Sequence, residues 1–134
     1  RRMSADIAYV DSSAFVKLVV TEPETAALRR DLSSWTRLTC SVLLVGEVMR
    51  AVLRTAPTSM QVASGLLASV DLVGITRARV QQAGLLQPPQ LRTLDALHLV
   101  SALAVGSRLG AFVTYDQRMA AAAQWHGLPV VTPT

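Results

Sequence analysis

The sequence predicts an α/β fold, namely a three-layer α/β/α sandwich around a central, mostly parallel sheet of about five strands. Two features of the chain support this prediction. Short, continuous apolar runs are typical of parallel strands that are buried on both faces. Helical patterns joined by short loops separate these runs, and this alternation builds a parallel sheet through right-handed crossovers.

Five short segments of mostly apolar sequence are expected to form the strands. Helices are expected in the connections, and each has a capping residue at its start or a glycine or proline at its end. The expected strands are Ile7–Val10, Arg37–Ser41, Asp71–Ile75, Ala111–Thr114 and Pro129–Val131. The expected helices are 14–20 capped by Ser12 or Ser13, one capped by Thr21 with Glu24 at capping-box spacing, 41–55, one from Thr58 or Ser59 to Ser69, 76–84, 93–105 capped by Thr93, and one from Asp116 to Trp125.

The length and composition are those of one folded domain. The chain has 134 residues, of which 51% are hydrophobic and 16% charged, and its mean hydropathy is +0.36. This apolar content argues against intrinsic disorder, and the length is sufficient to enclose a core. We therefore expect residues 1–134 to form a single domain. Because Met3 is a natural start residue, residues 1–5 are expected to be disordered or, for Arg1 and Arg2, foreign to the native chain.

The balance of charges is basic. The net charge is +4, and twelve of the thirteen basic residues are arginines. Because a guanidinium group forms paired hydrogen bonds to phosphate, one interpretation is a polyanionic partner such as nucleic acid. The other is a GC-rich coding sequence, which favours arginine whatever the function.

Cysteine content and hydropathy exclude several protein classes. A single cysteine, Cys40, excludes a disulfide framework and a multi-cysteine zinc site. No apolar run reaches the roughly 20 residues of a membrane span, since Asp95 and His98 interrupt the most apolar stretch. The first strand is too short to be the core of a secretory signal. We therefore expect a cytoplasmic protein without a membrane partner.

Two acidic residues directly follow expected strands. Asp11 follows the first strand and Asp116 the fourth, so both lie at the sheet edge where ligands bind in parallel α/β folds. An aspartate at a strand-to-helix junction is also a common helix cap. Taken singly, each of these residues is more simply explained as a cap than as a ligand.

Two further acidic residues lie in apolar helices. Glu47 shares one helical stripe with Arg50 and Arg54, which indicates either a narrow solvent face or a charged cleft. Asp95 lies in a helix that Thr93 can already cap, so it is free for another role, although it could also compensate the helix dipole. His98, one turn further on, is best interpreted as a hydrogen-bonded structural residue.

If the four acids converge at one end of the sheet, a divalent cation is the simplest reason for it. Adjacent carboxylates repel one another, which makes their ionisation unfavourable. Oxygen ligands are those that Mg²⁺ and Mn²⁺ prefer, and such ions activate water and stabilise charge on phosphoryl oxygens. The spacing of the acids is therefore consistent with phosphodiester hydrolysis.

Four sequence blocks contain these acids, and a fifth closes the chain. They are Tyr9-Val10-Asp11-Ser12-Ser13-Ala14, Glu47 in an apolar helix followed by Arg50-Ala51, Leu91-Arg92-Thr93-Leu94-Asp95-Ala96-Leu97-His98-Leu99, Phe112-Val113-Thr114-Tyr115-Asp116-Gln117-Arg118-Met119 and Gly127-Leu128-Pro129-Val130-Val131. In this order, and over almost the whole chain, the sequence resembles the PIN-domain family, and specifically the VapC-type toxins of bacterial type II toxin–antitoxin systems.

The resemblance implies a PIN-like nuclease domain with the activity of an Mg²⁺- or Mn²⁺-dependent endoribonuclease. Hydrolysis of an RNA phosphodiester would leave a 5′-phosphate and a 3′-hydroxyl. It implies Asp11, Asp95 and Asp116 as metal ligands, with Asp116 acting directly or through water, and Glu47 as the residue that positions the nucleophile or completes a second metal site. Ser12 and Thr114 match supporting hydroxyl positions. Candidate phosphate contacts are Arg50, Arg54, Arg92 and Arg118, which could equally be ordinary surface arginines.

The resemblance also implies protein partners. A cognate antitoxin would cover the cleft or insert an arginine near the acids, and a homodimer is expected. Candidate contact residues are Val16, Leu18, Val19 and Val20, for which burial in the core is the simpler explanation.

Other function classes fit the acidic residues less well. A non-catalytic RNA-binding or partner-binding module of the same fold is the main alternative. A receiver-type phospho-acceptor domain would need paired acids after the first strand and a lysine late in the chain, whereas Lys17 is the only lysine. A sugar-phosphate phosphatase would need an aspartate where Ser13 stands.

Overall fold

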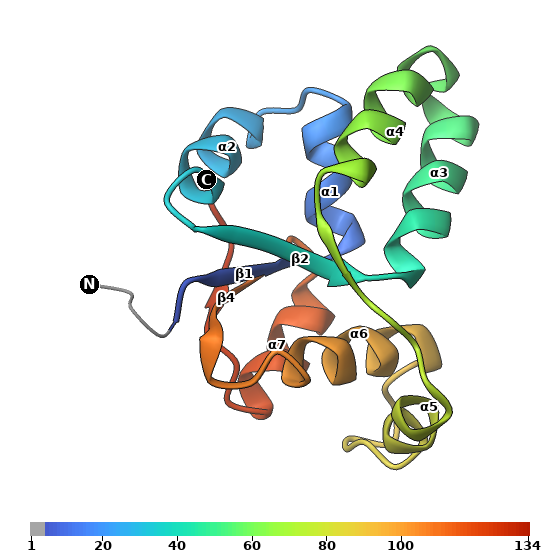
Figure 1. Ribbon diagram of the computed structural model, residues 1–134, viewed down its shortest axis with the longest axis vertical. Coiled ribbons are helices and arrows are strands. Elements are labelled where there is room, and N and C mark those ends of the chain that lie inside the picture. The colour runs from blue at the N-terminus through green and yellow to red at the C-terminus, as the bar shows by residue number, and fades with distance from the viewer. Residues whose placement is uncertain (1–4) are drawn as a thin grey trace.

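A five-stranded parallel sheet runs through the middle of the computed structural model, which describes residues 5–134 (Figure 1). The spatial order of the strands is β3-β2-β1-β4-β5, and every neighbouring pair is parallel. The predicted α/β fold with five parallel strands is therefore confirmed. The strands are β1 (Ile7–Val10), β2 (Arg37–Ser41), β3 (Asp71–Val73), β4 (Leu109–Val113) and β5 (Val130–Val131).

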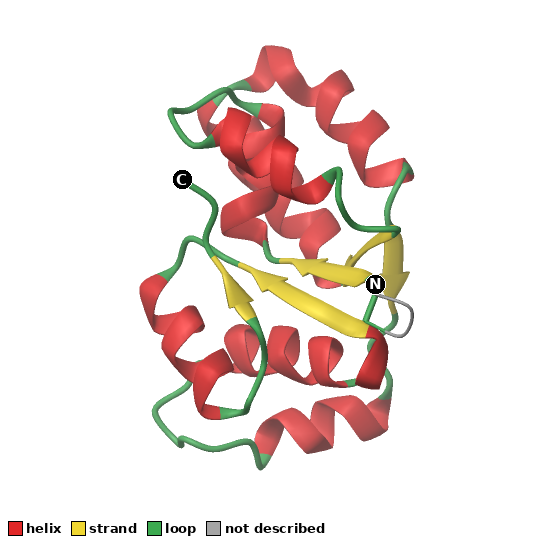
Figure 2. Cartoon of the chain, turned by 90° about the vertical axis from the view of Figure 1, so that its left-hand side faces the viewer, coloured by secondary structure: helices red, strands yellow, loops and turns green. Residues whose placement is uncertain are grey.

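Helices form a layer on each face of the sheet (Figures 1 and 2). Successive residues of a strand point to opposite faces, so Ala8 and Val10 join one core cluster while Tyr9 joins the other. The first layer contains α1 (Ser12–Val19), α2 (Thr25–Leu32), α3 (Leu43–Thr55) and α4 (Met60–Ala68); the second contains α5 (Arg77–Gly84), α6 (Thr93–Leu103) and α7 (Gln117–Trp125). Short 3₁₀ turns at Pro57–Ser59 and Gly106–Arg108 precede α4 and β4.

The strand order reverses direction between β1 and β4. The chain builds outward from β1 through β2 to β3, and then returns to the other side of β1 with β4 and β5. The ladder continues one residue past β1, where the Asp11 amide donates to the Val113 carbonyl at 3.1 Å. Loops leave such a switch point in opposite directions, which opens a crevice at the carboxyl ends of these two strands.

Several expected element boundaries differ from the structure. β4 begins two residues earlier than predicted and stops before Thr114, and β3 ends at Val73. Thr21 does not cap the second helix, since α2 begins only at Thr25. The Thr25 hydroxyl instead accepts the Glu22 amide at 2.9 Å and donates to the Lys17 carbonyl at 2.7 Å. The intervening residues are thereby folded into a turn.

The predicted caps are partly correct. The cap of α1 is Asp11, whose side chain accepts the Ala14 amide, so its interpretation as a cap is confirmed and the alternative caps Ser12 and Ser13 are wrong. Thr93 is the first residue of α6, and the cap position belongs to Arg92, whose side chain makes no capping bond. By contrast, Thr76 caps α5 and Asp116 caps α7 as predicted.

The expectation of an additional interaction face on α1 receives little structural support. Val16, Leu18 and Val19 pack against the core between α1 and the neighbouring helices.

Within residues 5–134, no helix is both long and apolar enough to cross a membrane. The expectation about residues 1–4 lies outside the described part of the chain, whereas Ala5 is described and half-buried.

Candidate active site

Asp11 occupies the switch point, where β1 turns into α1. Only 2% of its surface is exposed, and three donors orient its carboxylate. Oδ1 accepts the Ser13 hydroxyl at 2.6 Å and the Ala14 amide at 3.0 Å, while Oδ2 accepts the Thr114 hydroxyl. Burial nevertheless raises the pKa of Asp11, because the lost hydration outweighs these hydrogen bonds.

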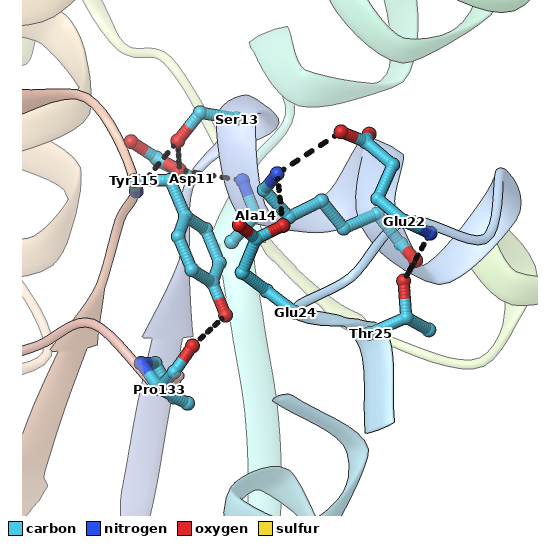
Figure 3. A network of polar contacts seen from close by, with 9 residues as sticks. Asp11, Ser13, Ala14, Glu22, Glu24, Thr25, Tyr115 and Pro133 are labelled. Carbon is cyan, nitrogen blue, oxygen red and sulfur yellow. Dashed lines mark hydrogen bonds and ion pairs between the residues drawn. The ribbon is translucent and has the colours of Figure 1, made fainter. Parts of the chain in front are cut away.

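The two hydroxyls that hold Asp11 also bind the backbone after β4. Ser13 Oγ accepts the Tyr115 amide at 2.9 Å, and Thr114 Oγ1 accepts the Asp116 amide at 3.1 Å. Figure 3 shows Ser13 between Asp11 and the Tyr115 backbone. Each hydroxyl therefore donates to the carboxylate and accepts from the β4–α7 turn. This arrangement fixes the position of Asp11 relative to Asp116.

Asp116 and Asp95 lie close enough for their charges to interact. Asp116 Oδ1 accepts the Arg118 and Met119 amides at 2.9 and 3.1 Å, which is its role as the α7 cap. Asp95 lies in the first turn of α6. Burial, and secondly the negative charge of Asp116, raise the pKa of Asp95. Asp95 therefore lies where negative charge is only partly offset by neighbouring positive groups.

Glu47 is held by a chain of hydrogen bonds through the second core. Its Oε1 lies 2.6 Å from His98 Nε2, and His98 Nδ1 lies 2.7 Å from the Tyr9 hydroxyl. The Ser41 amide donates to that hydroxyl at 3.1 Å, and burial raises the pKa of Tyr9 well above its usual range, so the neutral phenol can donate to Nδ1. Nε2 then carries the proton that Glu47 accepts.

Glu47 is directed toward α6. It faces His98, one helical turn beyond Asp95, and within the described residues no ion pair joins it to Arg50. His98 is 2% exposed and fully hydrogen-bonded, as expected for a structural histidine.

The four candidate arginines fall into two groups. Arg92 and Arg118 flank Asp95, where their positive charges partly offset the effect of burial on its pKa. Arg50 and Arg54 are exposed on α3. Within the described residues, no contact joins either of them to the acids.

The donor chemistry of the site suits a hard divalent cation. Glu47 and Asp116 each use only one carboxylate oxygen in the hydrogen bonds above, which leaves the second available. Among residues 5–134, no three acidic, histidine or cysteine side chains are already arranged as metal ligands. Mg²⁺ is commonly held by one or two carboxylates, with waters and substrate phosphate completing its octahedron, so the residues present fit such an ion.

Cys40 and Lys17 lie outside this constellation. Burial raises the pKa of the Cys40 thiol to about 12, so it is neither a nucleophile nor a thiolate ligand at neutral pH. Lys17 forms ion pairs with Glu22 and Glu24 at 3.2 and 3.0 Å. It is therefore committed to the α1–α2 turn, which disfavours a receiver-type site.

Sequence reasoning missed two parts of the site. The hydroxyl on Asp11 from the α1 side belongs to Ser13, and within the described residues the Ser12 side chain makes no bond to an acid of the site. The spacing of two residues after Asp11 is the signal that could have indicated Ser13, since a side chain there reaches back to a capping carboxylate. The role of Tyr9 had no sequence signal, because its partner His98 is 89 residues away.

Comparison with known proteins identifies the family of this chain. The chain matches the PIN domain over residues 8–124. It is 44% identical to Ribonuclease VapC46 of Mycobacterium tuberculosis over 94% of this chain and 97% of that protein, and 35% identical to Ribonuclease VapC47 of the same species over 93% and 96%. These are matches over nearly the full length of both proteins.

Solved structures share the fold at low sequence identity. The M. tuberculosis toxin VapC20, described as cleaving the sarcin–ricin loop, superposes with a TM-score of 0.75 at 18% identity, over 94% of this chain and 99% of that one. A chain of a toxin–antitoxin complex from Klebsiella pneumoniae superposes with a TM-score of 0.68 at 21% identity, over 95% and 98%.

Proposed function

This chain belongs to the PIN domain family and is related to the VapC ribonucleases, and from that premise we propose that it is a metal-dependent endoribonuclease, the toxin of a toxin–antitoxin pair. The proposal is supported by contacts that link acidic residues of separate elements near the β1/β4 switch point. Asp11 is tied to the Asp116 backbone through Thr114, and the charge of Asp116 acts on Asp95. Glu47 reaches the same helix through His98.

In this proposal Asp11, Asp95 and Asp116 hold Mg²⁺ or Mn²⁺. The bound ion supplies Lewis-acid stabilisation of the phosphoryl charge and lowers the pKa of water. The raised pKa values of Asp11 and Asp95 support the assignment, because a cation would relieve the cost of their ionisation.

The remaining groups would orient the reactants. Ser13 and Thr114 hold the Asp11 carboxylate by donation, so its position does not depend on the substrate. His98 holds one oxygen of Glu47, and the other oxygen would accept a hydrogen bond from the attacking water. Water attacks phosphorus, the P–O3′ bond breaks, and the leaving 3′-oxygen takes a proton.

Arginines would bind the RNA backbone on either side of this centre. Arg92 and Arg118 lie nearest to Asp95 and would contact phosphates next to the scissile one. Arg50 and Arg54 are assigned to more distant phosphates along the exposed face of α3. Replacing any one of these arginines by glutamine should weaken RNA binding in a salt-dependent, sequence-independent way.

We extend the proposal to an antitoxin that covers the acidic crevice, and to a homodimer of this chain inside the cell. Structural relatives include a chain described as part of a toxin–antitoxin complex. Carboxylates whose charge is only partly offset are suited to an inserted arginine. Light scattering of the purified chain, alone and co-expressed with its genetic neighbour, would measure both assemblies.

The decisive experiment compares the parent protein with Asp95→Asn on total bacterial RNA, mapping the new ends. We expect Mg²⁺- or Mn²⁺-dependent cleavage by the parent, none with EDTA, and at least about a hundredfold lower rate for the variant. Glu47→Ala serves as a second cleavage-deficient variant. Thermal unfolding in EDTA is the folding control, and Asp95→Asn should be no less stable than the parent, since it removes an ionised group whose pKa is raised by burial.

Two results would overturn the proposal. One is cleavage by repurified Asp95→Asn at the parental rate. The other is binding of several RNAs without metal-dependent turnover by the parent, which would identify a non-catalytic RNA-binding module.

A further inference from the structure

A groove outside the acidic crevice runs along α7. Four of its lining residues, Arg118, Ala121, Ala122 and Trp125, follow one another at the i, i+3, i+4, i+7 spacing of a single helical face. The two alanines form a low floor between two large side chains, which stand about 10 Å apart along the helix axis. Trp125 is 66% exposed, which is unusual for so large an apolar side chain.

The opposite wall comes from the loop before α6. Pro88, Gln90 and Leu91 complete a groove of about 370 Å³, within the range of roughly 300–1,000 Å³ typical of small-molecule sites. The far end is braced, because His126 Nε2 donates to the Gln87 carbonyl at 2.5 Å and its ring packs edge-on against Trp125, with centroids 4.9 Å apart. The spacing of the two walls is therefore set before any ligand arrives.

Arg118 connects one end of the groove to the acidic residues. Arg118 lines the groove, its amide donates to Asp116 Oδ1 at 2.9 Å, and its charge acts on Asp95. The same loop that forms the outer wall leads directly into α6 and Asp95. In Figure 1, α6 and α7 lie side by side below the sheet. A ligand in the groove would therefore be continuous with one bound at the acids.

These features identify the kind of ligand. An apolar slot with an exposed indole at one end and a guanidinium at the other is complementary to a flat aromatic group that carries a negative charge on one side. A nucleotide has this chemistry, since its base stacks on aromatic rings and its phosphate pairs with arginine. The groove also lies beside the centre proposed to cut RNA.

We infer that the Arg118–Trp125 groove binds an unpaired nucleobase of the RNA next to the scissile phosphate, by stacking on Trp125 while Arg118 holds its phosphate. The inference rests on the proposed ribonuclease function and specifies its substrate as single-stranded at this position. Stacking contributes affinity without strict base identity, so this groove selects for an unpaired strand.

Binding of labelled oligonucleotides tests the inference separately from cleavage. The probes are a short single-stranded oligouridylate and an abasic oligonucleotide of the same length, measured by fluorescence anisotropy in EDTA so that neither is hydrolysed. We expect the parent to bind the oligouridylate more tightly, and Trp125→Ala to weaken it by about tenfold while leaving the abasic probe unchanged. Trp125→Tyr should restore most of the difference, since it retains an aromatic face.

A matched control removes an exposed apolar side chain from the opposite layer. Val62, on α4, is 54% exposed, and Val62→Ala should leave both affinities unchanged. Arg118→Gln should weaken both probes and reduce the salt dependence, because it removes a phosphate contact.

The outcomes separate this inference from the proposed function. If the parent cleaves RNA but does not distinguish the two probes, or binds neither, the groove does not hold a base and the inference fails alone. If Trp125→Ala binds the oligouridylate like the parent yet no longer forms a complex with a co-expressed partner or a second copy, the groove is a protein interface and the inference is wrong. If the parent cleaves no RNA, the proposed function fails whatever the probes show.

Discussion

Replacing Thr114 by valine tests whether its hydroxyl, and not its packing, organises the crevice. Thr114 is fully buried, and its hydroxyl donates to Asp11 and accepts the Asp116 amide. Valine has nearly the same shape but neither donates nor accepts a hydrogen bond. Serine keeps the hydroxyl and loses only a methyl group, so Thr114→Ser is the matched control.

Thr114→Val is expected to lose more free energy of unfolding than Thr114→Ser. A hydrogen bond to a charged group contributes about 1.5–3 kcal/mol, and the Asp116 amide adds about 1 kcal/mol when it loses its acceptor. Thr114→Val should therefore lower the free energy of unfolding by about 2–4 kcal/mol. Thr114→Ser should lower it by about 1 kcal/mol, the cost of one buried methyl group.

Urea unfolding in EDTA measures both values, and its pH dependence tests the cause. The Thr114 hydroxyl opposes the effect of burial on the pKa of Asp11, so this pKa rises further in the valine variant. The difference between the two variants should be full at a pH above the raised pKa of Asp11, where its carboxylate is ionised. It should shrink as the pH falls through the raised pKa toward the ordinary aspartate value of about 3.9. A valine variant as stable as the serine variant at pH 7 would refute the reasoning.

The remaining predictions concern stability away from the site. A Cβ added at Gly110 would lie 2.3 Å from Trp35 Cζ3, so Gly110→Ala should destabilise the fold by about 1–3 kcal/mol in urea unfolding. Gly65→Ala on α4, where an added methyl group meets no described atom within 4 Å, should instead stabilise the fold by about 0.5–1 kcal/mol. A Gly110→Ala variant more stable than Gly65→Ala would contradict this account of the packing. Arg108 pairs with Asp6 through two hydrogen bonds and lowers the pKa of that carboxyl. Arg108→Gln should therefore lower the melting temperature at neutral pH, and this decrease should vanish at a pH below the ordinary range of aspartate pKa values. If the melting temperature of Arg108→Gln is still lower than that of the parent in acid, the loss is due to packing and not to the ion pair.

Local patterns were sufficient to predict the layers and most of the elements. The first two strands, β1 and β2, begin and end as predicted. For β1 the reason is its apolar run, since a strand covered on both faces is apolar throughout. Thr76 and Asp116 cap their helices as predicted, since capping depends on residues only two or three positions away. The start of β4 was missed because Leu109 is paired with Ile7 of β1, a long-range contact, and the register is irregular between Leu109 and Ala111.

Asp11 and Asp116 could be placed at the sheet edge from sequence because each follows the end of a strand. What each carboxylate bonds to could not be predicted in the same way. The Thr114–Asp11 bond spans 103 residues and the His98–Glu47 bond 51, so no local pattern contains them.

The order of residues along the chain therefore specified which side chains reach the end of the sheet, because strand and helix periodicities are local properties. Only the folded arrangement joined Ser13 to the Tyr115 amide, and Glu47 to His98 and Tyr9. Partners of buried polar groups are chosen by proximity in three dimensions, since each such group must find a donor or acceptor wherever the core places it.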